Sequence, residues 1–235
     1  GHAAQLTHRY SFDTDAGDDE IHAHGAFHGA AYADQGAAQF DGGTNNWVAL
    51  PPDLFTNYDS ITLECWFVDE GSPLATYLFQ FYGVSTTSTN INYTLDGQVV
   101  FSSPSAGAFI TTRPSVPLGT NHFVLTQDAA NKAVKVYLNS LLIGQRTNTS
   151  VSPVLVGSTP NARLGRSGFK GRLMEFRSYL GALNELEIAV DGALGNYAPV
   201  ASVLVRQGKG QQVVDDLKAI LRARESHVPT LERLL

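Results

Sequence analysis

The 235-residue sequence contains one cysteine, few charged residues and no long apolar run. A single cysteine excludes an internal disulfide, and the apolar neighbours of Cys65 indicate a small buried side chain. No run approaches the roughly 20 apolar residues that cross a bilayer, so we expect no transmembrane segment. The net charge of −6, with scattered Lys and Arg, argues against nucleic acid as a partner.

Sequence motifs of common catalytic sites are also missing. There is no G-x-S-x-G elbow, no H-E-x-x-H pair and no phosphate-binding loop. We therefore name no catalytic residue from motifs of this kind.

What the sequence does contain is a series of short strand patterns from Leu6 to about Leu194. In Ile61–Asp69, apolar residues alternate along one face with a mixed set on the other, the period of a half-buried strand. Clusters of Gly, Asn, Asp, Ser and Pro separate the patterns, and Asn139-Ser140 predicts a two-residue turn. We expect strands near residues 7–12, 37–42, 46–50, 61–69, 76–84, 91–96, 98–103, 121–128, 132–139 and 141–145, with further strands and a helical turn within 162–188.

The composition changes after Gly195. We expect residues 6–195 to form one sandwich domain and residues 196–235 to form a linker and an amphipathic helix. Apolar residues in Gln211–Arg224 recur at helical spacing. Such a helix docks on the sandwich, pairs with another chain as a homo-oligomer, or is disordered in isolation.

Four motifs occur in the order found in laminin-G-like, concanavalin A-like jelly rolls. They are AAQFDGGTNNWVALP (Ala37–Pro51), SITLECWF (Ser60–Phe67), KAVKVYLNSLLIGQ (Lys132–Gln145) and ARLGRSGFKGRLMEFRSYLGALNELEI (Ala162–Ile188). The sequence resembles that superfamily over about Leu6–Leu194. The resemblance implies an all-β fold, a two-sheet antiparallel jelly-roll sandwich, here with a C-terminal α-helical extension.

The resemblance also implies a structural calcium ion between the N-terminal polar segment and the Phe-Asp-Gly turn. Calcium takes six to eight oxygen ligands. The matching residues are Asp13, Asp15, Asp18, Asp41, Asn45 and Glu175. In the alternative interpretation, Asp13–Glu20 is a solvated loop and Asp41 caps the Gly42-Gly43 turn. Met174, which stands where relatives often carry an acid, counts against calcium.

A glycan site is a second expectation. Sugar-binding sandwiches offer aromatic side chains for the apolar faces of sugars and polar groups for the hydroxyls. Phe79 and Phe81 share one face of their strand and are expected in the core. The candidate residues are Trp47, Tyr82, Asn90, Asn92, Tyr93 and Arg113. For each aromatic candidate, core packing is the alternative.

Catalysis would need carboxylates on one strand face. The resemblance extends to glucanases that carry E-x-D-x-x-E on one strand, where the acids suit a retaining mechanism. That motif is absent here. The nearest cluster, Glu64 with Asp69 and Glu70, has the wrong parity, because Asp69 does not share the face of the two glutamates. We expect no enzyme.

Three histidines lie close together in the polar N-terminal segment. His22 and His24 would share a face in a strand, and same-face imidazoles bind zinc or nickel. The alternative for these two and for His28 is an exposed loop.

Together these patterns predict a non-catalytic module that binds a glycan or another cell-surface or matrix ligand. We recognise no signal peptide in these residues, yet the β-rich, weakly charged composition favours an extracellular or cell-surface location. The alternative function is a structural or assembly module in which helix 211–224 mediates oligomerisation or docking.

Overall fold

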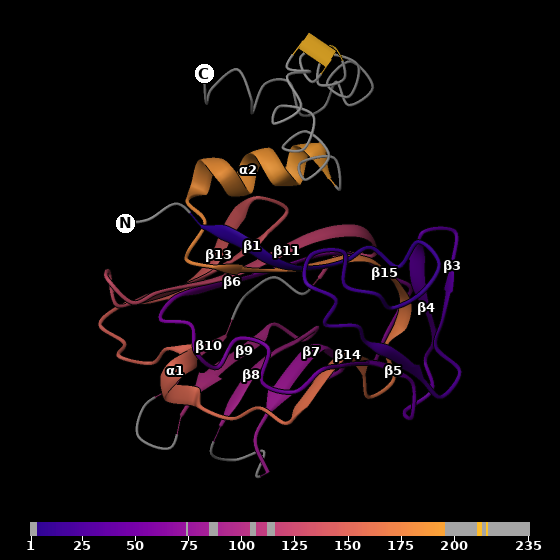
Figure 1. The fold of residues 1–235 in the computed structure, drawn as a ribbon, viewed down its shortest axis with the longest axis horizontal. Helices are drawn as coiled ribbons and strands as arrows, with labels where there is room; N and C mark the ends of the chain where they lie inside the picture. Colours follow the sequence, from indigo (N-terminus) through magenta and orange to yellow (C-terminus); the bar gives the residue numbers. More distant parts are fainter. Residues whose placement is uncertain are drawn as a thin grey trace. The chain divides into compact units, whose positions relative to one another are not determined.

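The computed structural model describes residues 4–73, 75–84, 89–103, 107–111 and 116–195, together with residues 211, 212 and 215. The chain divides into two compact units, Gly1–Ala182 and Leu183–Leu235. The described strands all lie in the first unit (Figure 1). The expected limits of 6–195 and 196–235 stay a prediction. Most of the helix expected at 211–224 lies outside the described residues, so its roles in docking and oligomerisation stay predictions too.

The first layer of the sandwich is an eight-stranded antiparallel sheet (Figure 1). Its order is β13 (Leu141–Arg146), β12 (Ala133–Leu138), β11 (Gly119–Asp128), β6 (Ile61–Asp69), β15 (Lys170–Leu180), β4 (Ala37–Asp41) and β3 (Tyr32–Asp34), with β1 (Gln5–Tyr10) also paired to β15. Strands distant in sequence are therefore neighbours, and central β6 pairs with β11 and β15.

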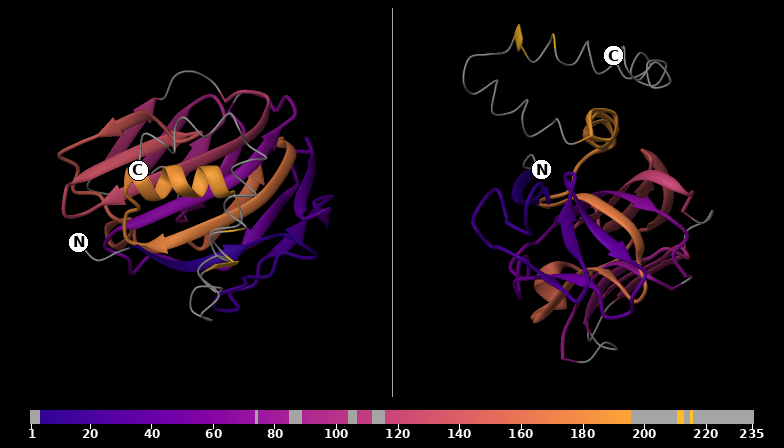
Figure 2. Two further views of the ribbon diagram at one scale, coloured as in Figure 1. Left: turned by 90° about the horizontal axis from the view of Figure 1, so that it is seen from above. Right: turned by 90° about the vertical axis from the view of Figure 1, so that its right-hand side faces the viewer.

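The second layer is a seven-stranded antiparallel sheet, seen below the first in Figure 1 and from two other sides in Figure 2. Its order is β10 (Gly107–Thr111), β9 (Gln98–Ser102), β8 (Asn90–Thr94), β7 (Tyr77–Tyr82), β14 (Asn161–Arg166), β5 (Trp47–Leu50) and β2 (Ala26–His28). Two antiparallel sheets stacked in this way confirm the predicted jelly-roll sandwich.

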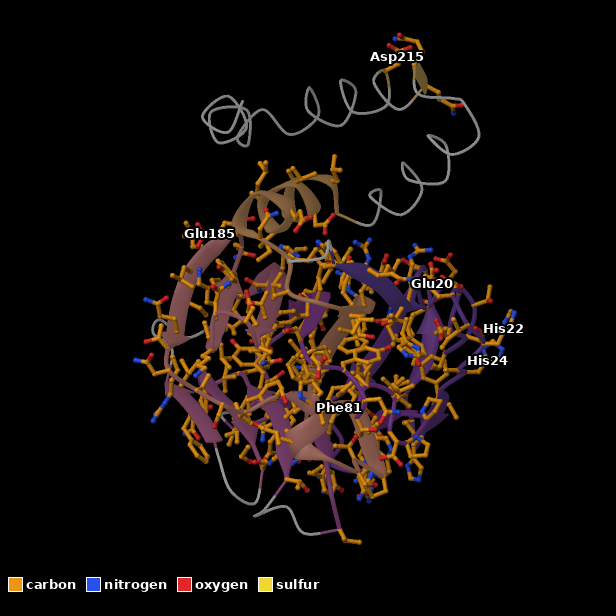
Figure 3. The ribbon with its side chains drawn as sticks, turned by 60° about the vertical axis from the view of Figure 1, so that its left-hand side comes forward. Glu20, His22, His24, Phe81, Glu185 and Asp215 are labelled. Atoms are coloured by element: carbon orange, nitrogen blue, oxygen red, sulfur yellow. The ribbon has the colours of Figure 1, made fainter. Side chains whose placement is uncertain are left out.

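The core between the sheets is rich in aromatic side chains. The ring centroid of Phe79 lies 5.8 Å from those of Phe81 and Phe123 and 6.3 Å from that of Phe176. Phe79 and Phe81 are almost fully buried, as predicted, and Figure 3 shows Phe81 inside the sandwich. Cys65 is buried as well, and its burial raises the pKa of the thiol.

The strands expected from the sequence are present, with bounds shifted by a few residues. Four short elements are absent from the expected set: β2, β3, β10 and α1 (Pro153–Val156). Strand β3 has no fully buried side chain, so no apolar alternation marks it. Helix α1 is a single turn that begins with proline, whose fixed φ suits the first helical position.

Helix α2 (Glu185–Leu194) belongs to the second unit and begins with a capping box. The Asn184 side chain accepts hydrogen bonds from the backbone N–H groups of Leu186 and Glu187, and the Glu187 carboxylate accepts one from the Asn184 backbone. Among the described residues, we find no helix with the length and apolar character needed to span a membrane.

The two-residue turn between β12 and β13 has positive φ at both positions, 51° at Asn139 and 65° at Ser140. This is the pattern of a type I′ hairpin turn, which favours Asn followed by Gly. Asn139 suits its position, because its side-chain oxygen accepts a hydrogen bond from the His122 backbone at 2.8 Å. Ser140 occupies a left-handed conformation without the freedom of glycine.

We predict that Ser140→Gly stabilises the protein by about 0.5–1 kcal/mol. Glycine removes a steric penalty of about 1–2 kcal/mol at this φ. Part of this gain is offset, because glycine loses more conformational entropy on folding than serine does. Urea unfolding measures the change. The control is Ser152→Gly, at a residue with extended backbone and no side-chain capping bond, which should not stabilise. An equal gain in both variants would contradict the explanation.

Candidate functional site

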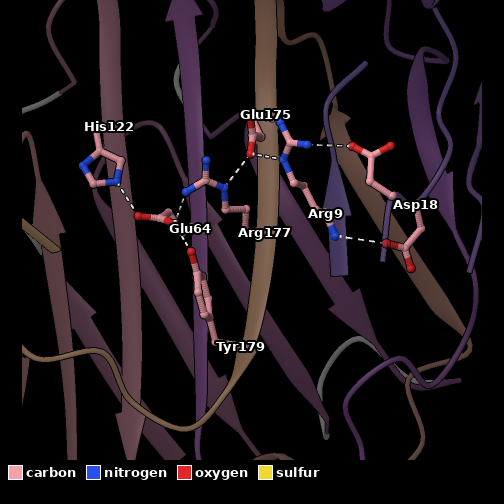
Figure 4. A network of polar contacts seen from close by, with 8 residues as sticks. Arg9, Asp18, Glu64, His122, Glu175, Arg177 and Tyr179 are labelled. Carbon is pink, nitrogen blue, oxygen red and sulfur yellow. Dashed lines mark hydrogen bonds and ion pairs between the residues drawn. The ribbon is translucent and has the colours of Figure 1, made fainter. Parts of the chain in front are cut away.

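Two polar clusters lie on the outer faces of the two sheets. The first is a network on the eight-stranded sheet, centred on the fully buried Glu64 (Figure 4). One carboxylate oxygen of Glu64 pairs with Nε2 of His122 at 2.8 Å. The other accepts from the Tyr179 hydroxyl at 2.8 Å and from Nη1 of Arg177 at 3.4 Å.

The network continues through Glu175, which joins two arginines. Its carboxylate accepts from Nε of Arg177 and, at 2.8 Å, from Nε of Arg9 (Figure 4). Arg9 also pairs with Asp19 at 3.1 Å. Glu64, Glu175 and Asp19 thus each pair with an arginine. The guanidinium carbon of Arg177 also lies 4.3 Å from the ring centre of Trp66.

The surroundings of Glu64 favour the ionised form of its carboxyl. Burial by itself raises the pKa of a carboxyl. Here the hydrogen bond from His122 and the charge of Arg177 outweigh burial, so the pKa of Glu64 lies below its ordinary value. A general acid needs a raised pKa near the working pH. Glu64 instead stays ionised and bonded within the network.

The N-terminal polar segment is organised by Asp18. Its Oδ1 accepts from the backbone N–H groups of Arg9 and Glu20, both at 3.0 Å. Its Oδ2 pairs with Nδ1 of His8 at 2.9 Å and accepts from the Ala23 backbone at 3.3 Å. Burial raises the pKa of Asp18, but the backbone bonds and His8 lower it by more. Both carboxylate oxygens of Asp18 therefore form hydrogen bonds within the protein.

The other expected calcium ligands are separated in the structure. Asp41 accepts a hydrogen bond from the Gly43 backbone at 2.8 Å, the turn cap of the alternative interpretation. Asp15 caps its own loop through Gly17 at 2.7 Å, Asp13 and Asn45 are exposed, and Glu175 belongs to the network above.

Within the described ranges, no three His, Cys, Asp or Glu side chains converge as a metal would require. The residues as placed do not fit the calcium site that the resemblance implies, and bound calcium stays a prediction. The rings of His22 and His24 lie 5.4 Å apart at the surface (Figure 3), and the same finding leaves them without a third ligand of these types in the described chain.

The second polar cluster lies on the outer face of the seven-stranded sheet. On β7, Gln80 stands opposite Asn92 of β8 and Arg163 of β14. Tyr82 likewise stands opposite Asn90. Because their strand neighbours point into the core, these side chains point outward.

Four of the predicted glycan residues share this face: Trp47, Tyr82, Asn90 and Asn92. Tyr93 does not, and its prediction was wrong. It is 1% exposed and stacks on Phe123 with ring centroids 4.0 Å apart. The reason is strand parity, since the neighbour of an outward Asn92 must point inward. Arg113 lies outside the described residues.

The aromatic rings of this face are covered by other side chains. His28 stacks on Trp47 with centroids 3.8 Å apart and an interplanar angle of 9°. The guanidinium carbon of Arg163 lies 4.5 Å from the same indole. Both groups cannot fit on one side of the ring, and β5 lies between β2 and β14, so Trp47 is sandwiched between them.

Tyr82 is bordered by two arginines. The guanidinium carbons of Arg163 and Arg166 lie 5.8 and 5.6 Å from its ring centre. Nη1 of Arg166 donates to the side-chain oxygen of Gln80 and lies 3.5 Å from the Tyr82 hydroxyl. Sequence reasoning missed both arginines. The available signal was the alternation of β14, in which Ala162 and Leu164 face the core on either side of Arg163.

Asn92 faces outward beside Gln80 in the middle of this sheet. It is only 4% exposed, and we find no hydrogen bond from its amide to another residue that the structure describes. The Glu64 network pairs its charges internally, whereas the seven-stranded sheet presents polar groups with spare capacity. We identify this outer face as the candidate functional site.

We predict that Glu64→Gln destabilises the protein by about 3–5 kcal/mol at pH 7, because it breaks the buried ion pair with Arg177 and leaves that cation with one carboxylate partner in place of two. The folded pKa of Glu64 is lowered, so its stabilisation is complete above the unfolded pKa of about 4.3 and is lost as pH falls through the folded pKa. The difference in the free energy of unfolding between the variant and the wild type should therefore become smaller at acid pH.

Urea unfolding at neutral and acid pH measures both effects. Glu70→Gln is the control, because Glu70 is half exposed and forms a surface pair with Arg172 at 3.8 Å. It should cost less than about 1 kcal/mol. A Glu64→Gln loss that does not change with pH would contradict the assignment of a lowered pKa.

The arrangement of the carboxylates leads to a prediction about calcium. Because Asp18, Asp41 and Glu175 already bond within the protein, millimolar calcium or excess chelator should leave the Tm unchanged. Differential scanning calorimetry tests this, with magnesium as the ionic-strength control. A rise in Tm specific to calcium would restore the implied site.

Comparison with solved structures places this architecture among known folds. Domain 4 of AbnA, a GH43 extracellular arabinanase from Geobacillus stearothermophilus solved with arabinotriose, is similar at TM-score 0.66 and 24% identity, covering 80% of this chain and 98% of that domain. Trypanosoma rangeli sialidase matches at TM-score 0.60 and 18% identity, covering 82% of this chain and 33% of its own. The binding domain of botulinum neurotoxin serotype C1 matches at TM-score 0.61 and 10% identity, covering 81% and 51%.

At these identities the likeness shows the fold alone, and the chain spans about a third of the sialidase and half of the toxin domain. Curated proteins returned no match. The family model for the concanavalin A-like lectin/glucanases superfamily matches residues 41–189, more than half of the sequence. The chain belongs to the concanavalin A-like lectin/glucanase superfamily.

Proposed function

We propose that this protein is a non-catalytic carbohydrate-binding domain whose ligand lies on the outer face of the seven-stranded sheet. The observation that carries the proposal is Asn92, an outward-facing amide, 4% exposed, for which we find no hydrogen-bond partner among the described residues. An amide offers both donors and an acceptor, which suits sugar hydroxyls. Gln80 pairs with Asn92 on the neighbouring strand, and Asn90 lies two residues before it on β8.

The distribution of carboxylates supports a binding role over hydrolysis. Most glycoside hydrolases use two carboxyl groups on either side of the scissile bond. The seven strands of this sheet contain no Asp and no Glu. The two buried glutamates of the other sheet are held in ion pairs. A face with hydrogen-bonding groups but no acid pair suits retention of a sugar.

The comparisons support the same proposal at the level of fold. The arabinanase domain, which has this architecture, was solved with arabinotriose and comes from an extracellular enzyme. Fold likeness does not assign a ligand. It agrees, however, with a sugar-binding module of an exported or cell-surface protein.

We predict that Asn92→Ala weakens glycan binding about tenfold, the equivalent of one hydrogen bond. Because the amide has no protein partner in the described chain, the substitution should leave the free energy of unfolding within about 1 kcal/mol of wild type. A glycan array identifies the ligand, and calorimetry measures its Kd for both proteins.

The matched control is Asn131→Ala, in the turn before β12 on the other sheet, where the amide bonds to Asp128. It should bind as wild type does. Absence of binding to every arrayed glycan at millimolar concentration would reject the proposal. Release of reducing ends from a bound polysaccharide would reject its non-catalytic part.

A further inference from the structure

The charges of the two sheets are distributed unequally. The strands of the eight-stranded sheet carry six acids: Asp34, Asp41, Glu64, Asp69, Asp128 and Glu175. The strands of the seven-stranded sheet carry none, and their charged side chains are two arginines, Arg163 and Arg166. In a chain of net charge −6, this sheet is a local exception.

The loop sequences between strands of this sheet continue the pattern. Residues 85–88 and 104–106 contain no Asp or Glu. One acid, Asp96, lies in the turn between β8 and β9, where it accepts a hydrogen bond from Thr94. Positive charge is therefore concentrated at β14.

Both arginines lack a carboxylate partner in the part of the chain that the structure describes. Three arginines of the eight-stranded sheet are paired: Arg9 and Arg177 with Glu175, and Arg172 with Glu70. The contacts of Arg163 and Arg166 are instead with Trp47, Tyr82 and Gln80. Both remain partly exposed.

The placement of these two cations favours an anion between or above them. Both guanidinium groups border the same Tyr82 ring, so two like charges are held close together without a counter-charge. Stacking on aromatic rings orients each planar group, and most N–H donors remain unused. An oriented guanidinium binds carboxylate or sulfate through two parallel hydrogen bonds.

The same contacts disfavour stacking of a neutral sugar. An aromatic platform needs a free ring face, but Trp47 is sandwiched between His28 and Arg163. Tyr82 is only 8% exposed. This face therefore presents N–H donors and amides more than open rings.

We propose that the ligand is an acidic oligosaccharide, with its carboxylate or sulfate bound by Arg163 and Arg166 and a neighbouring hydroxyl by Asn92. This inference rests on the proposed function, because it assigns a ligand class to the same face. The negative net charge of the chain argues against indiscriminate binding of polyanions.

The test compares matched acidic and neutral probes by calorimetry on the full chain. One pair is oligogalacturonate and its methyl ester, and the other is a sulfated oligosaccharide and its desulfated form. We expect the acidic member of at least one pair to bind about tenfold tighter or better than its neutral partner. Its affinity should fall as NaCl is raised to about 0.5 M. The pair that responds distinguishes carboxylate from sulfate.

Arg163→Gln and Arg166→Gln should each weaken binding of the acidic probe about tenfold and leave the neutral probe unaffected. The control is Arg146→Gln, which removes the same charge from exposed β13 of the other sheet and should bind as wild type does. Thermal melts of all three variants show that each is folded.

The outcomes separate the two proposals. Equal affinity for acidic and neutral probes, with loss of both in Asn92→Ala, would overturn the acidic ligand and retain carbohydrate binding. Unchanged affinity of folded Arg163→Gln and Arg166→Gln for the acidic probe would also overturn it. Failure of every probe, neutral and acidic, together with a negative glycan array, would overturn both.

Discussion

The arrangement of the outer face of the seven-stranded sheet depends on the aromatic core around Phe79. Once Phe79 and Phe81 are buried between the sheets, the period of two along β7 forces Gln80 and Tyr82 to the outer face. Pairing with β8 and β14 then brings Asn92 and Arg163 into the same row. A shift of one residue in the register of β7 would turn Phe79 and Phe81 outward and Gln80 and Tyr82 inward. The packing of the core therefore also fixes which side chains lie on the outer surface.

The two outer faces use polar groups in different ways. On the eight-stranded sheet, Glu64 and Glu175 meet His122, Arg9 and Arg177, and the buried charges neutralise one another. On the seven-stranded sheet, two arginines rest on aromatic rings and have no carboxylate partner among the described residues. Paired charges stabilise a fold, whereas oriented groups with unused donors are suited to recognition. Charge pairing, more than charge number, distinguishes the two surfaces.

Much of the fold could be predicted from the sequence, because strand alternation and turn residues are local signals. The Asn139-Ser140 turn and the inward faces of Phe79 and Phe81 followed from them. The glycan site itself stays a prediction. Trp47, Tyr82, Asn90 and Asn92 share one face, but Tyr93 was misplaced although strand parity could have excluded it. Calcium stays a prediction, but within the described ranges Asp18 and Asp41 bond to nearby backbone, a competition that composition does not reveal.

The sequence by itself determined the strand periodicity, the family likeness and the lack of a catalytic acid motif, since each depends on residues near one another in the chain. Only the tertiary structure decided which distant strands are neighbours. It placed β14 between β5 and β7, and so brought Arg163 against Trp47 and both arginines against Tyr82. It likewise placed Arg177 beside Glu64, more than a hundred residues away in sequence. Sheet order and register are set by packing of the whole core, so contacts across strands follow from no single segment.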